Sequence, residues 1–252
     1  MKHGLLIIFL LFTSAASAQP VSCVMPDAVS APAIEMPPSA EINRVRVHGY
    51  LLSLSWAPQY CRGRENDPRD VGQCGPKARF GFVLHGLWPE GKHQQDPAWC
   101  APAKPLSVDL IRQNFCMTPS VALIQHEWAK HGTCMTDRPE RYFQAASLIY
   151  RAVRFPDMEA LSRGPLTAGQ FMTAFAAANP GLRAEMMRIS ASQGGWLQEV
   201  RLCLDTRMRP RICPSGEPGY PPRRALKIWR MLHGLDFPSI YLELFAIDAL
   251  SG

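Results

Sequence analysis

Several features that would place this 252-residue sequence in a common class of protein are missing. No apolar run approaches the ~20 residues that a membrane-spanning helix needs, which excludes an integral membrane protein. The low charged fraction, 19% against 47% hydrophobic residues, excludes a disordered chain. No internal repeat is present. Length and composition therefore favour one sizeable core, which a single domain can supply.

Motifs of several familiar chemistries are also missing. No C-x-x-C pair supports a zinc ribbon or a thioredoxin-like redox site, and no G-x-S-x-G elbow supports a protease or esterase with a serine nucleophile. The zinc-protease pattern H-E-x-x-H is not completed, because the residue four positions after His126 is Lys130. His131 comes five positions after His126, which on a helix turns it away by about 140°. A metalloprotease is therefore excluded.

The first 18 residues have the pattern of a secretory signal peptide. Lys2 is followed by an apolar stretch over residues 4–12 and then by the small residues Ala16-Ser17-Ala18. We expect cleavage after Ala18 and a secreted or periplasmic protein. No Asn-x-Ser/Thr acceptor occurs, which favours a bacterial origin, although a non-glycosylated eukaryotic protein would look alike. The excess of Lys and Arg over Asp and Glu, 27 against 21, gives a mild positive field that helps to hold a polyanion.

An exported chain with eight cysteines is expected to form up to four disulfides. Eight cysteines allow 105 pairings, and the sequence alone does not choose among them. Local loop closure favours Cys61–Cys74 and Cys203–Cys213. The other four cysteines, which spacing leaves unassigned, are Cys23, Cys100, Cys116 and Cys134.

The remaining chain divides into a Pro-rich arm over residues 19–45, expected to be extended, and a folded part over residues 46–252. Apolar alternation predicts strands over residues 45–47, 50–56, 79–84, 196–204 and 240–245. Helical periodicity predicts helices near residues 106–115, 119–131, 139–153, 167–178 and 222–233. Because strands and helices alternate without a regular βαβ order, the fold class is expected to be α+β.

The helix predicted over residues 119–131 carries the most chemistry. Thr118 is expected to cap it, Pro119 to be its first residue and Gly132 to end it. Residues four apart lie one above the other on a helix, which pairs His126 with Lys130 and Glu127 with His131. Two imidazoles, a carboxylate and an ammonium group are thus concentrated within about one and a half turns.

A second candidate is His85, at the end of the apolar strand 79–84 and directly before Gly86. A strand end beside a glycine exposes a side chain on a rigid support. Taken alone, such a histidine is more often structural, and His48, His93 and His233 lack any comparable setting. His85 is therefore a catalytic candidate only in combination with the histidines and the charged residues of the helix predicted over residues 119–131.

Two segments together resemble the active-site segments of the ribonuclease T2 family. They are Phe82-Val83-Leu84-His85-Gly86-Leu87-Trp88-Pro89 and His126-Glu127-Trp128-Ala129-Lys130-His131-Gly132-Thr133-Cys134. Flanking pieces over residues 54–61 and 197–205 agree, so that the likeness covers roughly residues 46–215. The resemblance implies a single α+β domain with a mostly antiparallel sheet, stapled by disulfides. It also implies cleavage of RNA at acidic to neutral pH without a metal ion or other cofactor.

The family's chemistry can be assigned to residues of this chain. RNA carries its own nucleophile, the 2′-hydroxyl, so the enzyme must supply a base, an acid and a positive charge. We expect His131 to be the base, His85 the acid, Lys130 the stabiliser of the transition state and His126 a phosphate-binding residue. Glu127 is expected to orient His131, or to bind the phosphate when protonated. DNA lacks the 2′-hydroxyl and is not expected to be a substrate.

The resemblance also bears on two tryptophans and on the cysteines. Trp88 is expected either to stack a nucleobase or to be a core residue, whereas Trp128 is expected in the core. In the family, the cysteine that closes the second segment pairs with one after the first segment, which implies Cys100–Cys134. Cys23 and Cys116 are then left to each other and would tie down the Pro-rich arm.

Two classes of function stay open at this point. One is a secreted endoribonuclease that cleaves single-stranded RNA with low base specificity, through 2′,3′-cyclic phosphates to 3′-phosphate ends. The other is a catalytically silent RNA-binding protein on the same fold. The full set His85, Glu127, Lys130 and His131 favours the enzyme, and we expect a monomer.

Overall fold

The computed structural model describes residues 22–37, 39–92, 95–215 and 219–231. Within these residues a four-stranded antiparallel sheet has the order β2-β1-β4-β3. The strands are β1 (Gly49–Trp56), β2 (Phe82–Glu90), β3 (Met187–Ala191) and β4 (Leu197–Leu204). The sheet thus leaves only β1 between β2, which carries the first predicted active-site segment, and β4, which lies far from it in sequence. An α+β fold with an antiparallel sheet is confirmed.

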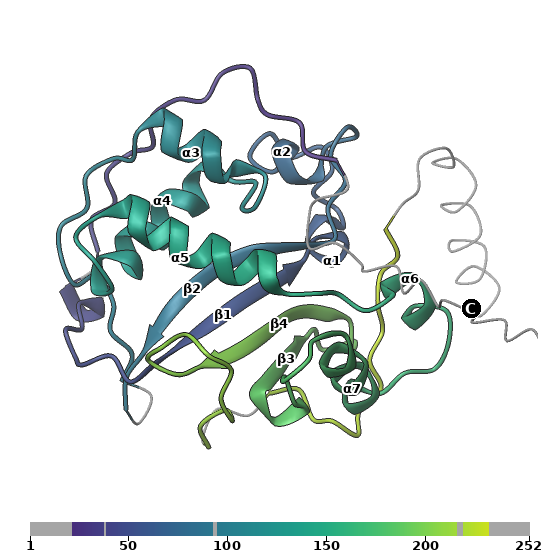
Figure 1. Cartoon of the computed structure of the whole chain (residues 1–252). Helices are drawn as coiled ribbons and strands as arrows, with labels where there is room; N and C mark the ends of the chain where they lie inside the picture. Colours follow the sequence, from purple (N-terminus) through teal and green to yellow (C-terminus); the bar gives the residue numbers. More distant parts are fainter. Residues whose placement is uncertain (1–21, 38, 93–94, 216–218, 232–252) are drawn as a thin grey trace, which may run out of the picture.

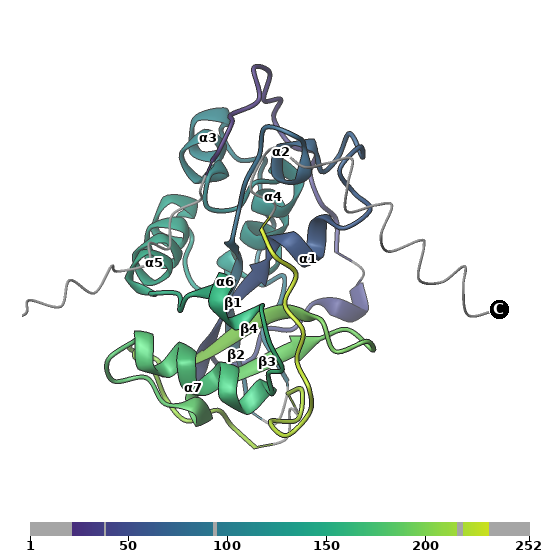
Figure 2. The same cartoon turned by 90° about the vertical axis from the view of Figure 1, so that its right-hand side faces the viewer.

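Helices of very different length surround this sheet (Figure 1). In both views α3, α4 and α5 lie on the side of β1 and β2, whereas α7 lies beside β3 (Figure 2). The helices are α1 (Ala57–Cys61), α2 (Val71–Cys74), α3 (Val108–Phe115), α4 (Val121–Lys130), α5 (Pro139–Ala152), α6 (Met158–Leu161) and α7 (Ala168–Ala178). Three 3₁₀ turns are η1 (Ser39–Glu41), η2 (Gly132–Cys134) and η3 (Ala184–Met186).

The core lies between the sheet and these helices. Leu52 and Leu54 of β1 are fully buried, as is Ile124 of α4. Trp128 of α4 is also buried and packs against Tyr142 of α5, which confirms it as a core residue. This packing holds α4 against the β2 side of the sheet and so fixes the position of the predicted catalytic helix.

The ends of α4 differ from those predicted. Ser120, not Thr118, is the N-cap, and its hydroxyl oxygen accepts from the backbone amide of Leu123. The Thr118 hydroxyl instead donates to the carbonyl of Leu84 at 2.8 Å and ties the helix entrance to β2. Gly132 does not end the helix, which stops at Lys130, and instead belongs to η2.

Gly132 is required at its position for a different reason from the one expected. A Cβ there would clash with the indole ring of Trp128 and would lie 3.0 Å from the ring of Tyr142. The glycine therefore allows close packing against two aromatic rings. Glycines at helix C-termini often adopt the left-handed backbone conformation, which has a positive φ. Gly132 does not adopt it, because the positive-φ glycines of the described residues are Gly63, Gly181 and Gly195.

Other predictions were wrong or fall outside the described residues. The helix predicted over residues 222–233 is absent from its described part, residues 222–231, where Ala225 and Lys227 form isolated β-bridges. The backbone amides of Leu226 and Lys227 bond to other loops rather than along a helix. Residues 45–47 precede β1 and form no strand, while the short strand β3 was not expected. The strand predicted over 240–245 lies outside the described residues.

All four expected disulfides are present: Cys23–Cys116, Cys61–Cys74, Cys100–Cys134 and Cys203–Cys213. The first ties the Pro-rich arm to the end of α3 and the third ties the loop before α3 to η2. Over residues 22–37 the arm contains no helix, as its prolines predict. In the described part of the chain no helix is long and apolar enough to cross a membrane.

Candidate active site

His85 stands in the middle of β2, on a β-bulge. In the ladder with β1, Ser53 pairs with Gly86 and Leu54 with Leu84, so that His85 is the unpaired extra residue. The sequence placed His85 at a strand end, with Gly86 and Pro89 as terminators. Both residues instead continue the strand, and Pro89 is tolerated because β2 is an edge strand. The bulge re-aims the imidazole while β1 keeps the backbone rigid.

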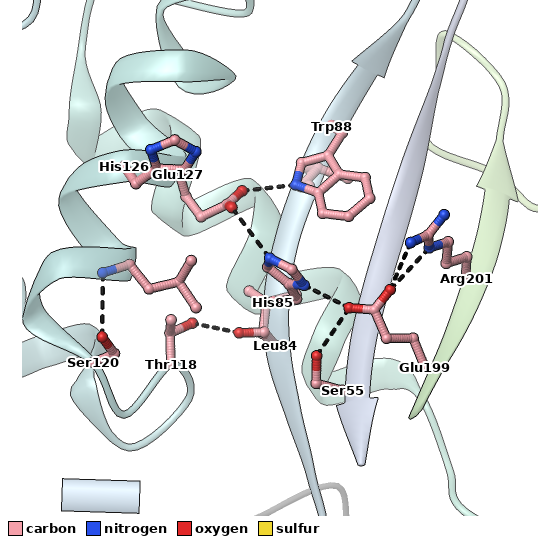
Figure 3. Close-up of polar contacts among 12 residues, drawn as sticks. Ser55, Leu84, His85, Trp88, Thr118, Ser120, His126, Glu127, Glu199 and Arg201 are labelled. Atoms are coloured by element: carbon pink, nitrogen blue, oxygen red, sulfur yellow. Dashed lines mark hydrogen bonds and ion pairs between the residues drawn. The ribbon is translucent and has the colours of Figure 1, made fainter. Parts of the chain in front are cut away.

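The imidazole of His85 lies between two carboxylates (Figure 3). Its Nδ1 is 2.6 Å from Oε1 of Glu199, on β4, and its Nε2 is 3.8 Å from Oε1 of Glu127, on α4. The side chain of His85 is one-third exposed (33%), whereas both glutamates are largely buried. The histidine is therefore accessible to a substrate, while its contact with the buried Glu199 fixes the orientation of its ring.

Glu127 reaches the sheet because β2 has a glycine at that point. A Cβ on Gly86 would lie 2.6 Å from Cδ of Glu127, so no larger residue leaves room for the carboxylate. Oε2 of Glu127 accepts a hydrogen bond of 2.8 Å from the indole nitrogen of Trp88. The carboxylate thus faces Trp88 and His85, and its expected partnership with His131 is limited to a backbone bond, from the amide of His131 to the carbonyl of Glu127.

Trp88 lies close to both candidate catalytic histidines. Its ring centroid is 5.0 Å from that of His85, edge to face, and 5.5 Å from that of His131, at an interplanar angle of 30°. His131 follows α4 as its C-cap, and its Nδ1 is buried without a hydrogen-bond partner among the described residues. The guanidinium of Arg201 lies 5.4 Å from the centroid of the Trp88 ring. Trp88 is therefore half-buried in the site itself rather than in the core.

Burial and charge push the pKa values of the two histidines in opposite directions. Burial lowers the pKa of His131 to about 3, and the charge of Lys130 and of the other two histidines adds to this effect. Burial also acts to lower the pKa of His85, but the hydrogen bond to Glu199 and the charges of Glu127 and Glu199 outweigh it. The pKa of His85 consequently lies above its ordinary value of 6.5.

The two carboxylates on His85 also differ in charge. Burial raises the pKa of Glu127 to about 7, against the opposing effects of His85, Trp88 and Lys130. Burial would raise the pKa of Glu199 as well, but the contact with His85 and the charge of Arg201 bring it down to about 2. At mild pH, Glu199 is thus ionised and Glu127 is divided between its two forms.

The Pro-rich arm brings two acids to the remaining cations of α4. Oε2 of Glu35 is 2.8 Å from Nδ1 of His126, and Oε2 of Glu41 is 3.9 Å from Nζ of Lys130. The ring of Trp99 lies edge to face with His126, 5.4 Å between centroids. His126 and Lys130 are about one-third exposed, at 37% and 31%. They therefore form a partly open basic surface beside His131, with the two acids of the arm against it.

All six residues predicted from the sequence lie around α4 and β2, but the sequence missed Glu199. A Glu and an Arg two positions apart in the mostly apolar segment Leu197–Leu204 were its only signal, since i and i+2 share a face of a strand. That signal becomes informative only when β4 is known to be an inner strand, where a charge needs a partner. Glu35 and Glu41 were missed because neither the extended segment around Glu35 nor the single 3₁₀ turn that contains Glu41 is long enough to give a periodic pattern.

Comparison with known proteins gives the same assignment as the two motifs. The family model described as the Ribonuclease T2 family matches residues 47–210. A ribonuclease of Aeromonas hydrophila is 32% identical over 174 residues, which cover 67% of this chain and 76% of that protein. A probable ribonuclease of Haemophilus influenzae is 30% identical over 177 residues, which cover 66% of this chain and 61% of that protein. The two bacterial relatives fit the bacterial origin that the sequence favours.

Solved structures share the fold at lower identity. A structure described as trichomaglin, a novel S-like ribonuclease, has a TM-score of 0.58 at 20% identity and covers 72% of this chain and 97% of its own. RNase NT in complex with 5′-AMP has a TM-score of 0.56 at 22% identity, covering 73% of this chain and 98% of its own. These structures show the fold, whereas the family match and the bacterial relatives show the family. The chain belongs to the ribonuclease T2 family.

Proposed function

We propose that the protein is an endoribonuclease that cleaves single-stranded RNA by acid–base transesterification without a metal ion. The 2′-oxygen attacks the neighbouring phosphorus, the bond to the 5′-oxygen breaks, and a 2′,3′-cyclic phosphate results. Slower hydrolysis then gives a 3′-phosphate. The observation that carries the proposal is the pair of histidines whose rings both lie within 5.5 Å of the Trp88 ring and whose pKa values are displaced in opposite directions. Such a pair is what one acid and one base require.

His131 serves as the base and His85 as the acid. A base must be neutral, and a pKa of about 3 keeps His131 neutral throughout the mild pH range. An acid must be protonated, and the raised pKa of His85 extends its protonated form beyond pH 6.5. The proton taken from the 2′-hydroxyl goes to His131, and the proton given to the departing 5′-oxygen comes from Nε2 of His85.

The charged groups on α4 receive the phosphate. Lys130 stabilises the negative charge that grows on the pentacoordinate phosphorus, and His126 binds the phosphate at the start. Glu127, with a pKa of about 7, is protonated in part of the molecules and then donates a hydrogen bond to a phosphate oxygen. Trp88 offers the exposed part of its ring to a base. Stacking tolerates every nucleobase, which accounts for a low base specificity.

The deciding experiment uses purified protein with poly(U) and poly(dU), in EDTA, with identification of the product ends. Cyclic phosphate ends from the RNA and an intact DNA are expected. Replacement of His85 or His131 by alanine is expected to lower the rate about 10²- to 10⁴-fold. His48→Ala serves as the matched control, because His48 lies just before β1 and outside the site. Intact RNA with folded, disulfide-bonded protein would instead make it an RNA-binding protein without turnover.

The proposal also places the protein outside the cytoplasm. The four disulfides fit an oxidising compartment, either the periplasm or the exterior. We infer removal of residues 1–18, an arm over residues 19–45 and a monomeric catalytic domain over residues 46–252. Mass spectrometry of the exported protein is expected to find residue 19 at the amino terminus, and light scattering a single chain; any other start or a stable dimer would contradict this part.

A further inference from the structure

Glu199 contacts His85 from the side opposite to Glu127, and both of its oxygens are engaged. Oε1 is 2.6 Å from Nδ1 of His85 and accepts from the hydroxyl of Ser55 at 3.1 Å. Oε2 accepts two hydrogen bonds from the guanidinium of Arg201, at 3.0 and 2.8 Å. Only 12% of the side chain is exposed. This carboxylate is therefore held in one place rather than solvated (Figure 3).

The register of the sheet fixes this arrangement. Ser55 of β1 pairs directly with Glu199 of β4, and Arg201 follows two positions later on the same face. Since β1 also pairs with β2, the carboxylate reaches across the central strand to the bulge that carries His85. A pair of Glu and Arg needed only to stabilise the sheet would be complete without the histidine. The short contact with His85 is the part that stability does not require.

We propose that Glu199 is a positioning residue for the acid: its carboxylate, clamped by Ser55 and Arg201, accepts the Nδ1–H of His85 and leaves Nε2 as the only atom that gives up a proton. The inference rests on the function proposed above. An ionised carboxylate can only accept hydrogen bonds, so the hydrogen between the two groups belongs to Nδ1. The transferable proton of the imidazolium is then on Nε2, which faces the open site and Glu127.

Charges around His85 explain why a clamped carboxylate is needed. Glu127 and His131 face it from α4 and its C-cap, while Glu199 and Arg201 face it from β4. Burial disfavours the imidazolium, and Glu127 is only partly ionised, so Glu199 is the permanent counter-charge. The contact with His85 and, after it, the charge and hydrogen bonds of Arg201 lower the pKa of Glu199 and keep it ionised. Without Glu199, we expect His85 to lose its proton at a lower pH and its ring to turn more freely.

The first test compares two substrates that differ in their need for an acid. Uridylyl-3′,5′-adenosine must protonate its leaving oxygen, whereas uridine 3′-(4-nitrophenyl phosphate) releases a stable phenolate. We expect Glu199→Ala to lower kcat on the dinucleotide about 10- to 100-fold, with KM changed by less than about twofold. The loss on the nitrophenyl ester should be about threefold or less. Equal losses on both substrates would overturn the proposal, because a merely structural role weakens all catalysis alike.

The second test measures the proton itself. Glu199→Gln keeps an accepting oxygen and the shape of the side chain but removes the charge. We expect it to restore part of the kcat lost in Glu199→Ala and to move the alkaline limb of the pH–rate profile to lower pH. Nitrogen-detected NMR of His85 should show the same fall in its pKa. An unchanged titration in Glu199→Gln would overturn the proposal.

A matched control separates this effect from the loss of an ion pair. Asp205 follows β4 directly and also accepts two hydrogen bonds from one guanidinium, that of Arg209, and none of its side-chain hydrogen-bond partners among the described residues is a histidine. Asp205→Asn is expected to leave kcat and the titration of His85 unchanged; a change equal to that of Glu199→Gln would count against the proposal. If the wild-type protein leaves RNA intact, the proposed function fails, and the NMR titration still decides whether Glu199 fixes the proton of His85.

Discussion

The strongest prediction concerns the acidic limb of the pH–rate profile. kcat/KM reports the groups of the free enzyme, and its acidic limb reports the base. With a pKa of about 3, His131 is about 99% neutral at pH 5, whereas a histidine with the ordinary pKa of ~6.5 is only about 3% neutral. Burial and the neighbouring charges therefore leave about 30 times more of the His131 imidazole in its neutral form at pH 5. We expect activity to stay high from about pH 4 to pH 6.5.

At the alkaline end of the pH–rate profile, activity depends on a group that must be protonated rather than neutral. His85 must be protonated, so activity is present below its raised pKa and falls as pH rises through it. Deprotonation of Glu127, centred at about pH 7, adds a negative charge beside the phosphate and steepens the fall. The assay is the initial rate of dinucleotide cleavage from pH 3 to 8.5 at constant ionic strength, with circular dichroism at each pH to verify folding. An acidic limb centred near pH 6.5 in folded protein would refute the assignment of His131.

Three further predictions follow from contacts outside the two histidines. Replacing Glu35 and Glu41 by glutamine removes the acids that contact His126 and Lys130 and should lower KM for RNA severalfold at unchanged kcat. Steady-state kinetics at low salt measure this change, and an unchanged KM would mean that the arm does not compete with phosphate. Gly86→Ala inserts a methyl group into the space of a buried carboxylate, so both kcat and the melting temperature should fall; normal values of both would contradict the packing. The disulfide Cys100–Cys134 closes a loop of 34 residues, so its removal in the double alanine variant should lower the free energy of unfolding by about 4 kcal/mol. Urea titrations measure this loss, and a loss below about 1 kcal/mol would contradict the loop-entropy argument.

Local patterns in the sequence were enough to predict α3, α4, α5 and α7 and three of the strands. Each has a clear period and a buried face, and α4 in particular carries its chemistry within a single segment. The helix predicted over residues 222–233 shows the limit of such reasoning. Its described part passes between the loops around Leu166 and Gly195 and satisfies its backbone there, a choice that depends on tertiary neighbours and not on local propensity.

The candidate site was predictable where it lies in one segment and not where the sheet assembles it. His126, Glu127, Lys130 and His131 come from one helix end. Glu199 comes from a strand more than a hundred residues after His85, and only the ladder through β1 makes them neighbours. The bulge could not be predicted for the same reason, because a bulged residue is recognised only from the register between its strand and the neighbouring strand.

Two local features of β2, a bulge and a glycine, explain how an ordinary antiparallel sheet gives His85 two different carboxylate neighbours. The bulge turns His85 out of the alternation of β2, so that its ring projects toward β4 on one edge and α4 on the other. The missing Cβ of Gly86 then admits Glu127. One carboxylate is held by an arginine and stays charged; the other is held by an indole and is free to titrate. In the proposed mechanism Nε2 delivers the proton, because it lies on the side of the titrating carboxylate while Nδ1 is held by the charged one.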